Sequence, residues 1–296
     1  MKSHNAELLL ALVTVIWGGT FLFTKIGLEY TNFSFYMILR FSVAFTASLL
    51  VFGRYYKSFD KKVFKAGLVL GLLFGVGFIF QTLGLKFTAV SNSAFITGLT
   101  VPLTPIVAYF VLRKRFKYAS LLGVLVAFTG LTIYTNPFKN SFNIGDLVTL
   151  ISTLFWAFYI TYMDVLTKEI KTYKQTSLIV VIQLFFCLLI SIIVFFIFEL
   201  RDFYFIPSWN LVLSLGFNGI LASLIVTFIQ TSAQKFTTPV KAALIFSMEP
   251  IFASVFSAVL GLEFMTSIKI IGGSVMLMGI VVSEIGPNVI KYLKKS

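Results

Sequence analysis

The sequence contains little charge, one cysteine and one histidine. Charged residues make up 12% of its 296 positions and hydrophobic residues 58%, and the mean hydropathy is +0.96. A soluble domain of this length needs more polar surface than such a composition supplies. Because Cys187 is the single cysteine, an internal disulfide is excluded, and the only histidine, His4, lies in the N-terminal tail. We therefore expect no histidine-based metal site, no histidine proton relay in the membrane and no cofactor.

Motifs for ATP use, catalysis and nucleic-acid binding are also missing. The chain has no Walker-type Gly-rich phosphate loop, no His–Glu–His zinc arrangement and no pair of intramembrane aspartates. These absences argue against an enzyme, and a membrane-embedded enzyme that modifies lipids is the least favoured alternative. The net charge of +13 would suit a nucleic-acid binder, but the basic residues lie in short runs between apolar segments, where they set topology. Nucleic acid is therefore not an expected partner.

Apolar segments of about 20 residues, each able to cross about 30 Å of hydrocarbon, recur along the whole chain. They predict an all-α integral membrane protein with ten transmembrane helices, surrounded by the lipid bilayer. The predicted spans are 7–27, 33–53, 64–84, 89–112, 117–135, 145–166, 176–198, 209–232, 237–261 and 267–286. No small-residue cleavage site follows the first span, so we expect an uncleaved anchor.

The basic residues are unevenly divided between the two sides of the predicted membrane. With the N-terminus placed in the cytoplasm, 17 Lys and Arg residues fall in cytoplasmic segments and 5 in external ones. Cytoplasmic loops carry the excess of Lys and Arg in membrane proteins. Both termini are therefore predicted to be cytoplasmic, in a multi-pass protein of the cell (plasma) membrane.

One stretch of the sequence occurs twice. Residues 81–88 and 230–237, which are 149 positions apart, share Gln, Thr, Lys, Phe and Thr at matched places, and each copy leads into an apolar segment with a proline. Five spans per half is an odd number, so the second half must enter the membrane from the opposite side. The sequence therefore predicts two inverted five-helix repeats, residues 1–136 and 137–296, which form one transport unit. Duplication as a packing device is the alternative.

Short motifs place these spans in a known family. They are Trp17-Gly18-Gly19-Thr20-Phe21 in the first span, Arg40-Phe41 in the second, Met248-Glu249-Pro250-Ile251-Phe252-Ala253 in the ninth, and Gly261-Leu262-Glu263 after it. In this order, the chain resembles the EamA-type members of the drug/metabolite transporter superfamily over nearly its full length. The resemblance implies a ten-helix secondary carrier that moves small metabolites, often outward, through a central cavity lined by both halves. One departure is residues 114–116, where members often carry a glutamate-containing run.

Three charged residues within the predicted spans are candidate functional groups, because hydrocarbon penalises a central charge by at least about 2.5–3.5 kcal/mol. Glu249 lies midway along the ninth span, where it either meets substrate or a proton, or pairs with a cation or helix terminus and only stabilises the bundle. Arg40 either snorkels to the external surface or faces the cavity and binds a carboxylate. Lys241, eight residues before Glu249, either snorkels or shares a helix face with it.

Aromatic residues form a second group of candidates. Trp17 lies mid-helix in the first span, and Trp156 and Tyr159 lie mid-helix in the sixth, away from the usual interfacial belt. This placement predicts a cavity wall that stacks against flat or apolar cargo. Ordinary helix packing is the alternative in a chain with 17% aromatic residues.

Amides and prolines complete the candidates. The amides either line the cavity or join neighbouring helices by hydrogen bonds, and the prolines are predicted to kink helices that line it. The residues are Gln81, Gln230 and Asn92 among the amides and Pro102, Pro105 and Pro250 among the prolines.

These features together predict a secondary active transmembrane transporter. We expect it to export small organic metabolites, such as amino acids or amphipathic drugs, by alternating access. A small-molecule substrate is the expected partner, and protons acting through Glu249 are the hypothetical coupling ion. A passive, channel-like facilitator is the alternative, against which the central glutamate and the inverted halves argue.

Overall fold

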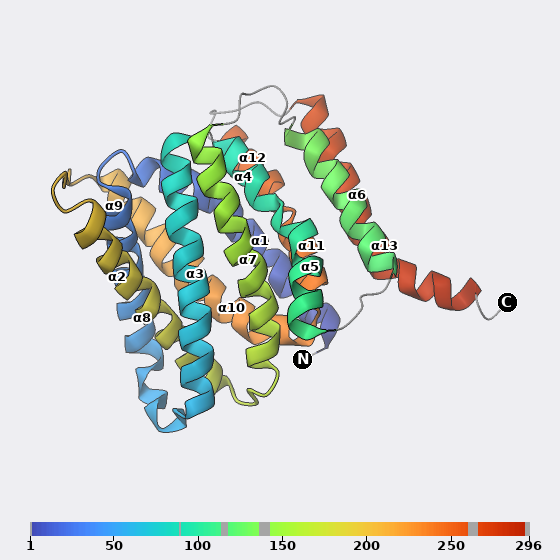
Figure 1. Cartoon of the computed structure of the whole chain (residues 1–296), viewed down its shortest axis with the longest axis horizontal. Coiled ribbons are helices and arrows are strands. Elements are labelled where there is room, and N and C mark those ends of the chain that lie inside the picture. The colour runs from blue at the N-terminus through green and yellow to red at the C-terminus, as the bar shows by residue number, and fades with distance from the viewer. Residues whose placement is uncertain (1, 89, 114–117, 136–142, 260–265, 294–296) are drawn as a thin grey trace.

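The computed structural model describes residues 2–88, 90–113, 118–135, 143–259 and 266–293 (Figure 1). Within these ranges the chain is built from helices, and extended pairing is limited to an isolated antiparallel bridge between Thr31 and Phe205. The predicted all-α class is therefore confirmed.

The helices follow the order of the chain. They are α1 (Ser3–Gly27), α2 (Phe33–Phe52), α3 (Lys61–Phe87), α4 (Val90–Gly98), α5 (Thr100–Leu112), α6 (Tyr118–Thr135), α7 (Ile144–Thr167), α8 (Tyr173–Phe198), α9 (Trp209–Leu215), α10 (Val226–Ala233), α11 (Pro239–Phe246), α12 (Glu249–Val259) and α13 (Ser267–Leu293). A π-helical segment, η3 (Gly216–Ile225), joins α9 to α10, and the short 3₁₀ helices η1 (Gly53–Ser58) and η4 (Gln234–Phe236) follow α2 and α10.

Seven helical stretches in the described part of the chain are long and apolar enough to cross a membrane. They are Ser3–Gly27, Phe33–Ser58, Lys61–Phe87, Ile144–Thr167, Tyr173–Phe198, Trp209–Phe236 and Pro239–Phe256. The shorter apolar helices Ile96–Leu112, Leu121–Tyr134 and Ser267–Val282 fall in the other three predicted spans. The chain is thus a multi-pass membrane protein, and the count of ten spans remains a prediction.

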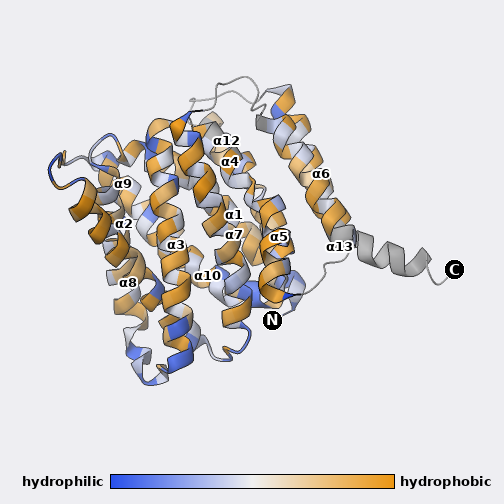
Figure 2. Cartoon of the chain, viewed as in Figure 1, coloured by the Kyte–Doolittle hydropathy of each residue, from blue (hydrophilic) through white to orange (hydrophobic). Residues whose placement is uncertain are grey.

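Hydrophilic residues gather at the ends of the helices, and apolar residues cover most of their length (Figure 2). Two basic loops lie together at the lower end in Figure 1, where Lys62 at the start of α3 pairs with Glu169 after α7, with 2.6 Å between Nζ and Oε2. At the same end the carboxylate of Asp60 accepts a 2.8 Å hydrogen bond from the backbone N–H of Val63 and caps α3. This bond holds the pKa of Asp60 below its usual range.

Glycines bring α6 and α13 into backbone contact. A Cβ added at Gly130 would lie 2.8 Å from the carbonyl oxygen of Gly272, and one added at Gly279 would lie 2.7 Å from that of Gly123. Gly272 lies 149 positions after Gly123, and Gly279 lies 149 positions after Gly130, which is the spacing of the repeated stretch. Each contact is therefore the counterpart of the other in the two halves. Small residues allow such close approach of helices inside a bilayer. The two helices therefore run side by side along one edge of the bundle (Figure 1).

Two of the predicted spans are interrupted. The span predicted over 89–112 is divided at Leu99 into α4 and α5, and the span predicted over 237–261 is divided after Phe246 into α11 and α12. The first residues of α5 and α12, Thr100 and Glu249, are 149 positions apart. At both interruptions the chain makes a hydrogen-bonded turn, in which the backbone N–H of Leu99 donates to Ile96 across 3.0 Å and that of Met248 donates to Ile245 across 3.2 Å.

Two of the three candidate prolines lie near the start of a helix. Pro102 is the third residue of α5 and Pro250 the second residue of α12, so each lies in a first turn, whereas Pro105 lies further inside α5. A first turn tolerates proline because its N–H groups have no partner within the helix. At these two sites the proline therefore removes no hydrogen bond from the interior of its helix, and the kinks remain a prediction.

Candidate functional site

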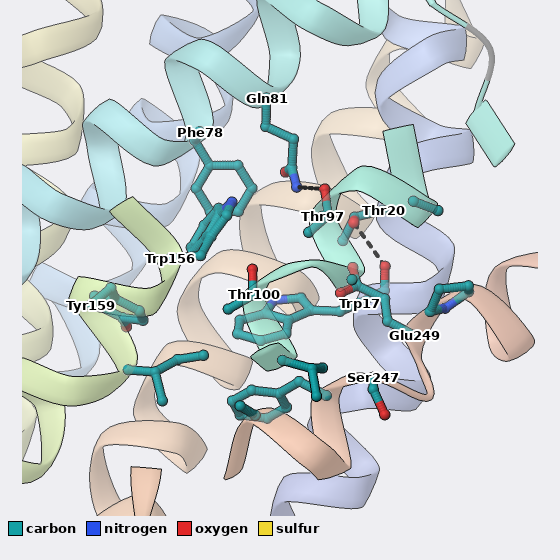
Figure 3. Close-up of a pocket in the computed structure, with 17 residues that line it drawn as sticks. Trp17, Thr20, Phe78, Gln81, Thr97, Thr100, Trp156, Tyr159, Ser247 and Glu249 are labelled. Carbon is teal, nitrogen blue, oxygen red and sulfur yellow. Dashed lines mark hydrogen bonds between the residues drawn. The ribbon is translucent and has the colours of Figure 1, made fainter. Parts of the chain in front are cut away.

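A cavity lies in the middle of the bundle, between α1, α3, α4, α5, α7, α11 and α12 (Figure 3). Both predicted halves contribute to its wall. The lining residues are Trp17, Thr20, Phe78, Gln81, Ala94, Thr97, Gly98, Thr100, Val101, Trp156, Tyr159, Ile160, Ala243, Phe246, Ser247, Glu249 and Pro250. It leaves about 40 Å³ for the centres of water molecules, which is room for about three waters.

Two glycines position the first helix against this cavity. A Cβ at Gly18 would lie 2.5 Å from the Cβ of Phe252 in α12, and one at Gly19 would lie 2.7 Å from the ring of Phe217 in η3. Larger residues would push α1 away from both elements. The motif that begins at Trp17 therefore combines a cavity-lining indole with two positions of close helix approach.

Aromatic rings form a continuous part of the wall. The ring centroids of Trp17 and Trp156 are 6.4 Å apart, Trp17 meets Phe246 at 5.1 Å, and Trp156 meets Phe78 at 4.8 Å with the ring planes 89° apart. Tyr159 completes this group at 6.0 Å from Trp156. Rings in edge-to-face arrangement give a rigid apolar surface. The structure thus brings together the three aromatic residues that the sequence nominated.

Polar groups interrupt this apolar wall. Gln81 donates a 3.1 Å hydrogen bond to the hydroxyl of Thr97, and the hydroxyl of Tyr159 accepts one of 2.9 Å from Gln183. By contrast, the indole N–H of Trp156 and the hydroxyl of Thr100 are buried and have no hydrogen-bond partner among the described residues. Buried polar groups are nearly always paired. These two residues therefore bring unused hydrogen-bonding groups to the cavity wall.

Glu249 stands at the interruption between α11 and α12. It lines the cavity and is the first residue of α12, where the positive end of the helix dipole favours a carboxylate. Across the described residues, the ion pairs do not include Glu249. Of the two alternatives for a stabilising partner, a cation and a helix terminus, the structure thus offers the helix terminus.

Arg40 lies behind the cavity wall and does not line it. Its side chain is 1% exposed, its Nε donates a 2.9 Å hydrogen bond to the hydroxyl of Ser223, and its guanidinium carbon lies 4.2 Å from the ring centroid of Phe78. Its Nη2 has no partner in the described part of the chain. The residue therefore neither snorkels to the surface nor faces the cavity, and Phe78 separates its charge from Trp156.

Lys241 and Gln230 lie outside the cavity wall. Lys241 pairs with Glu7 of α1 across 3.3 Å, so it joins α11 to α1 near one end of the bundle. Gln230 donates a 2.9 Å hydrogen bond to Gln234 and bridges neighbouring turns. The side chain of Asn92 lies outside the described residues.

Several lining residues were not nominated by the sequence. Phe78 lies one turn before Gln81 on α3, so helical spacing from that amide points to it. Thr100 lies 149 positions before Glu249, so the repeat spacing also points to it. Thr97 and Ser247 carry no such signal, because their approach to the cavity depends on the two helix interruptions.

The sequence matches a transporter family, and the fold matches a solved structure. The model of the EamA-like transporter family matches twice, over residues 4–136 and 143–284. An uncharacterized transporter of Archaeoglobus fulgidus is 30% identical over 95% of this chain and 86% of its own length. The uncharacterized transporter YcxC of Bacillus subtilis is 28% identical over 74% of this chain and 73% of its own length. A solved crystal structure with 16% identity superposes with a TM-score of 0.76 and covers 96% of this chain and 97% of its own.

Proposed function

The chain belongs to the EamA-like transporter family, and on this premise we propose that it is a secondary active exporter of small organic metabolites. One observation carries the proposal: a central cavity lined by both halves of the chain, with two interrupted helices whose second parts begin 149 positions apart. Interrupted helices at the middle of a bundle are the usual substrate sites of secondary transporters. The protein lies in the plasma membrane with both termini in the cytoplasm.

Alternating access is the proposed mechanism. The cavity holds only about three waters in this conformation, so helices must separate before a metabolite can bind. The contact of Gly130 with Gly272 and that of Gly279 with Gly123 are counterparts in the two halves, which supports a pseudo-two-fold axis between the halves. Halves related in this way have outward-open and inward-open arrangements of similar energy. A channel that is permanently open needs a continuous passage, so this small cavity argues against that form of the alternative.

The chemistry of the wall supports a partly apolar cargo with polar ends. Trp17, Trp156 and Phe246 offer ring faces and edges to a flat or apolar body, whereas the indole N–H of Trp156 donates one hydrogen bond. The hydroxyl of Thr100 adds a donor or acceptor, and the carboxylate of Glu249 attracts a cation. Amino acids and amphipathic amine drugs combine these features.

A ligand screen with matched variants tests the carrier. We expect some member of a panel of amino acids and amphipathic cationic drugs to raise the melting temperature of the purified protein, because a ligand of the folded state stabilises it by mass action. The shift should disappear in Trp156→Ala and persist in Trp209→Ala, whose indole is 79% exposed. A shift that survives Trp156→Ala would place the ligand outside this cavity.

Transport measurements at several pH values test the coupling ion. In everted membrane vesicles, uptake of the identified ligand should saturate, show counterflow and vary with pH, and Glu249→Gln should abolish the pH dependence because an amide carries no proton. The matched control is Glu169→Gln, which removes an exposed carboxylate outside the membrane. An unchanged pH profile in Glu249→Gln would refute proton coupling through this residue, and flow without counterflow would favour the channel-like alternative.

A further inference from the structure

The C-terminal halves of α3 and α8 form the walls of a second cavity, an open groove that is separate from the central cavity. The volume open to the centres of water molecules is about 590 Å³ in this groove and about 40 Å³ in the central cavity. Its walls are apolar, with Ile79 and Leu83 on α3 and Ile190, Val194 and Phe198 on α8. Phe198 is 71% exposed on a helix that spans the membrane. The groove therefore opens toward the hydrocarbon.

The distribution of glycine along α3 explains the groove. In the first half of the helix, Gly67, Gly71 and Gly75 face α8, and a Cβ added at Gly71 would lie 2.8 Å from the carbonyl oxygen of Gln183. In the second half, Gly84 instead faces α7, where a Cβ would lie 2.8 Å from the carbonyl oxygen of Gly145. The helix thus approaches α8 at one end and α7 at the other. Large side chains then keep α3 and α8 apart where the groove lies.

Charged residues of both signs close one end of the groove. Lys86 lies in the last turn of α3, Glu199 caps the end of α8, and Asp202 follows it. The acidic segment is held in place, because the carboxylate of Glu199 accepts a 2.9 Å hydrogen bond from the backbone N–H of Ser34, and the backbone oxygen of Asp202 accepts one of 3.1 Å from the side-chain amide of Asn32. One cation and two carboxylates therefore line the groove where its apolar walls end.

We propose that this groove binds a phospholipid with a primary-amine headgroup, phosphatidylethanolamine. An acyl chain lies between α3 and α8, Lys86 attracts the phosphate, and Glu199 and Asp202 accept hydrogen bonds from the ammonium. Phosphatidylglycerol fits poorly because it brings a net negative charge to two carboxylates. Phosphatidylcholine has no N–H to donate. The site is independent of the central cavity, so its test does not depend on the transported substrate.

Native mass spectrometry tests the lipid site. Purified protein is incubated with equal amounts of phosphatidylethanolamine, phosphatidylcholine and phosphatidylglycerol that carry identical acyl chains, and retained lipid is counted. We expect several-fold more phosphatidylethanolamine than either other lipid. The double variant Lys86→Ala/Asp202→Asn should lose this preference, whereas Lys65→Ala, at the other end of α3, should keep it. Val194→Trp, which fills the groove, should lower retention of all three lipids.

Three outcomes would overturn the proposal. Equal retention of the three lipids by the unmodified protein would mean that the headgroup is not read. Preference for phosphatidylglycerol would mean that Lys86 acts without the two carboxylates. A preference that survives the double variant would mean that phosphatidylethanolamine binds elsewhere. Because Lys86 and Asp202 are exposed, the double variant should unfold at the same temperature as the unmodified protein, which a melting curve checks.

Discussion

Arg40 is a charge enclosed in an apolar bundle with little to compensate it. Its Nε donates a hydrogen bond to the hydroxyl of Ser223, and its guanidinium carbon lies 4.2 Å from the ring centroid of Phe78. A desolvated cation over an aromatic ring gains about 2 kcal/mol, which is less than the usual penalty for removing an ion from water. The contacts of Arg40 therefore offset only part of the free-energy cost of burying its charge.

Substitutions of Arg40 separate the effects of charge and shape. Arg40→Lys keeps the charge but loses the planar group that stacks and the Nε donor, so we expect a loss of about 2–4 kcal/mol in the free energy of unfolding. Arg40→Met fills similar space without charge and should change stability by less than about 1 kcal/mol. Denaturant unfolding in detergent measures both. Greater damage from methionine than from lysine would show that the charge itself stabilises the bundle.

For single residues, the sequence predicted the position along a helix better than the direction in which the side chain points. It placed Trp17, Trp156 and Glu249 midway along their helices, and the structure has all three in the cavity wall. For Lys241 it left open snorkelling or a helix face shared with Glu249, and the structure has this side chain paired with Glu7 of α1. Whether a polar residue faces the cavity or a neighbouring helix depends on contacts between segments, which helical spacing alone does not contain. The functional roles of all these residues remain predictions.

At the scale of the helices, close contacts between them depend on single glycines. Gly272 is the most constrained case, because an added Cβ would lie 2.4 Å from the backbone nitrogen of Tyr134 and 2.5 Å from its Cα. Backbone atoms of α6 cannot rotate away as a side chain can. The whole helix must move to accept even a methyl group.

An alanine at Gly272 should therefore loosen the pair formed by α6 and α13. We expect Gly272→Ala to lower the free energy of unfolding by about 1–3 kcal/mol through overpacking. The control is Gly216→Ala, since a Cβ there has no neighbour within 4 Å, and alanine is the better helix former. Thermal unfolding in detergent compares them. Equal melting temperatures for the two variants would show that α6 and α13 shift apart without cost.

The sequence predicted helical elements more successfully than their interruptions. Hydropathy and length located the apolar segments, but they cannot distinguish a kinked helix from two helices that meet in the middle of a membrane. Pro250 marks the region, yet the break precedes it because proline is tolerated in a first turn. The π-helical segment η3 has no local signal either. Its contacts help to explain it: the carbonyl of Ala222 accepts a 3.3 Å bond from Trp17, and Ser223 accepts one from Arg40.

At the scale of the whole molecule, repetition organises both the sequence and the packing. The second parts of the two interrupted helices begin at residues that are 149 positions apart. The glycines in the contact between α6 and α13 form two pairs with the same spacing. A spacing read from the sequence thus recurs in three-dimensional contacts. Those contacts leave the membrane orientation of each half to be measured, because the direction in which a helix crosses a bilayer is set by charge outside it.

Matched residues in the two copies of the repeated stretch provide that measurement. Phe87 ends α3 and is 53% exposed, and Phe236 ends η4 and is 38% exposed. If the halves are inverted, these equivalent positions lie on opposite sides of the membrane. We expect a membrane-impermeant maleimide to label Phe87→Cys in intact cells and Phe236→Cys only after permeabilisation. Cys187 is fully buried, so the unmodified chain should stay unlabelled and serves as the control.

The labelling pattern also decides between the two explanations of the repeat. Labelling of both variants from the same side would make the halves parallel, and the duplication would then be a packing device without a pseudo-two-fold axis in the membrane plane. Labelling of Phe236→Cys in intact cells and of Phe87→Cys only after permeabilisation would keep the inversion but reverse the orientation of the termini. The excess of basic residues on one predicted side, 17 against 5, argues against that reversal. The expected pattern, with Phe87→Cys labelled in intact cells and Phe236→Cys only after permeabilisation, would show that the halves are inverted. Inverted halves are what alternating access between outward-open and inward-open states requires in this mechanism.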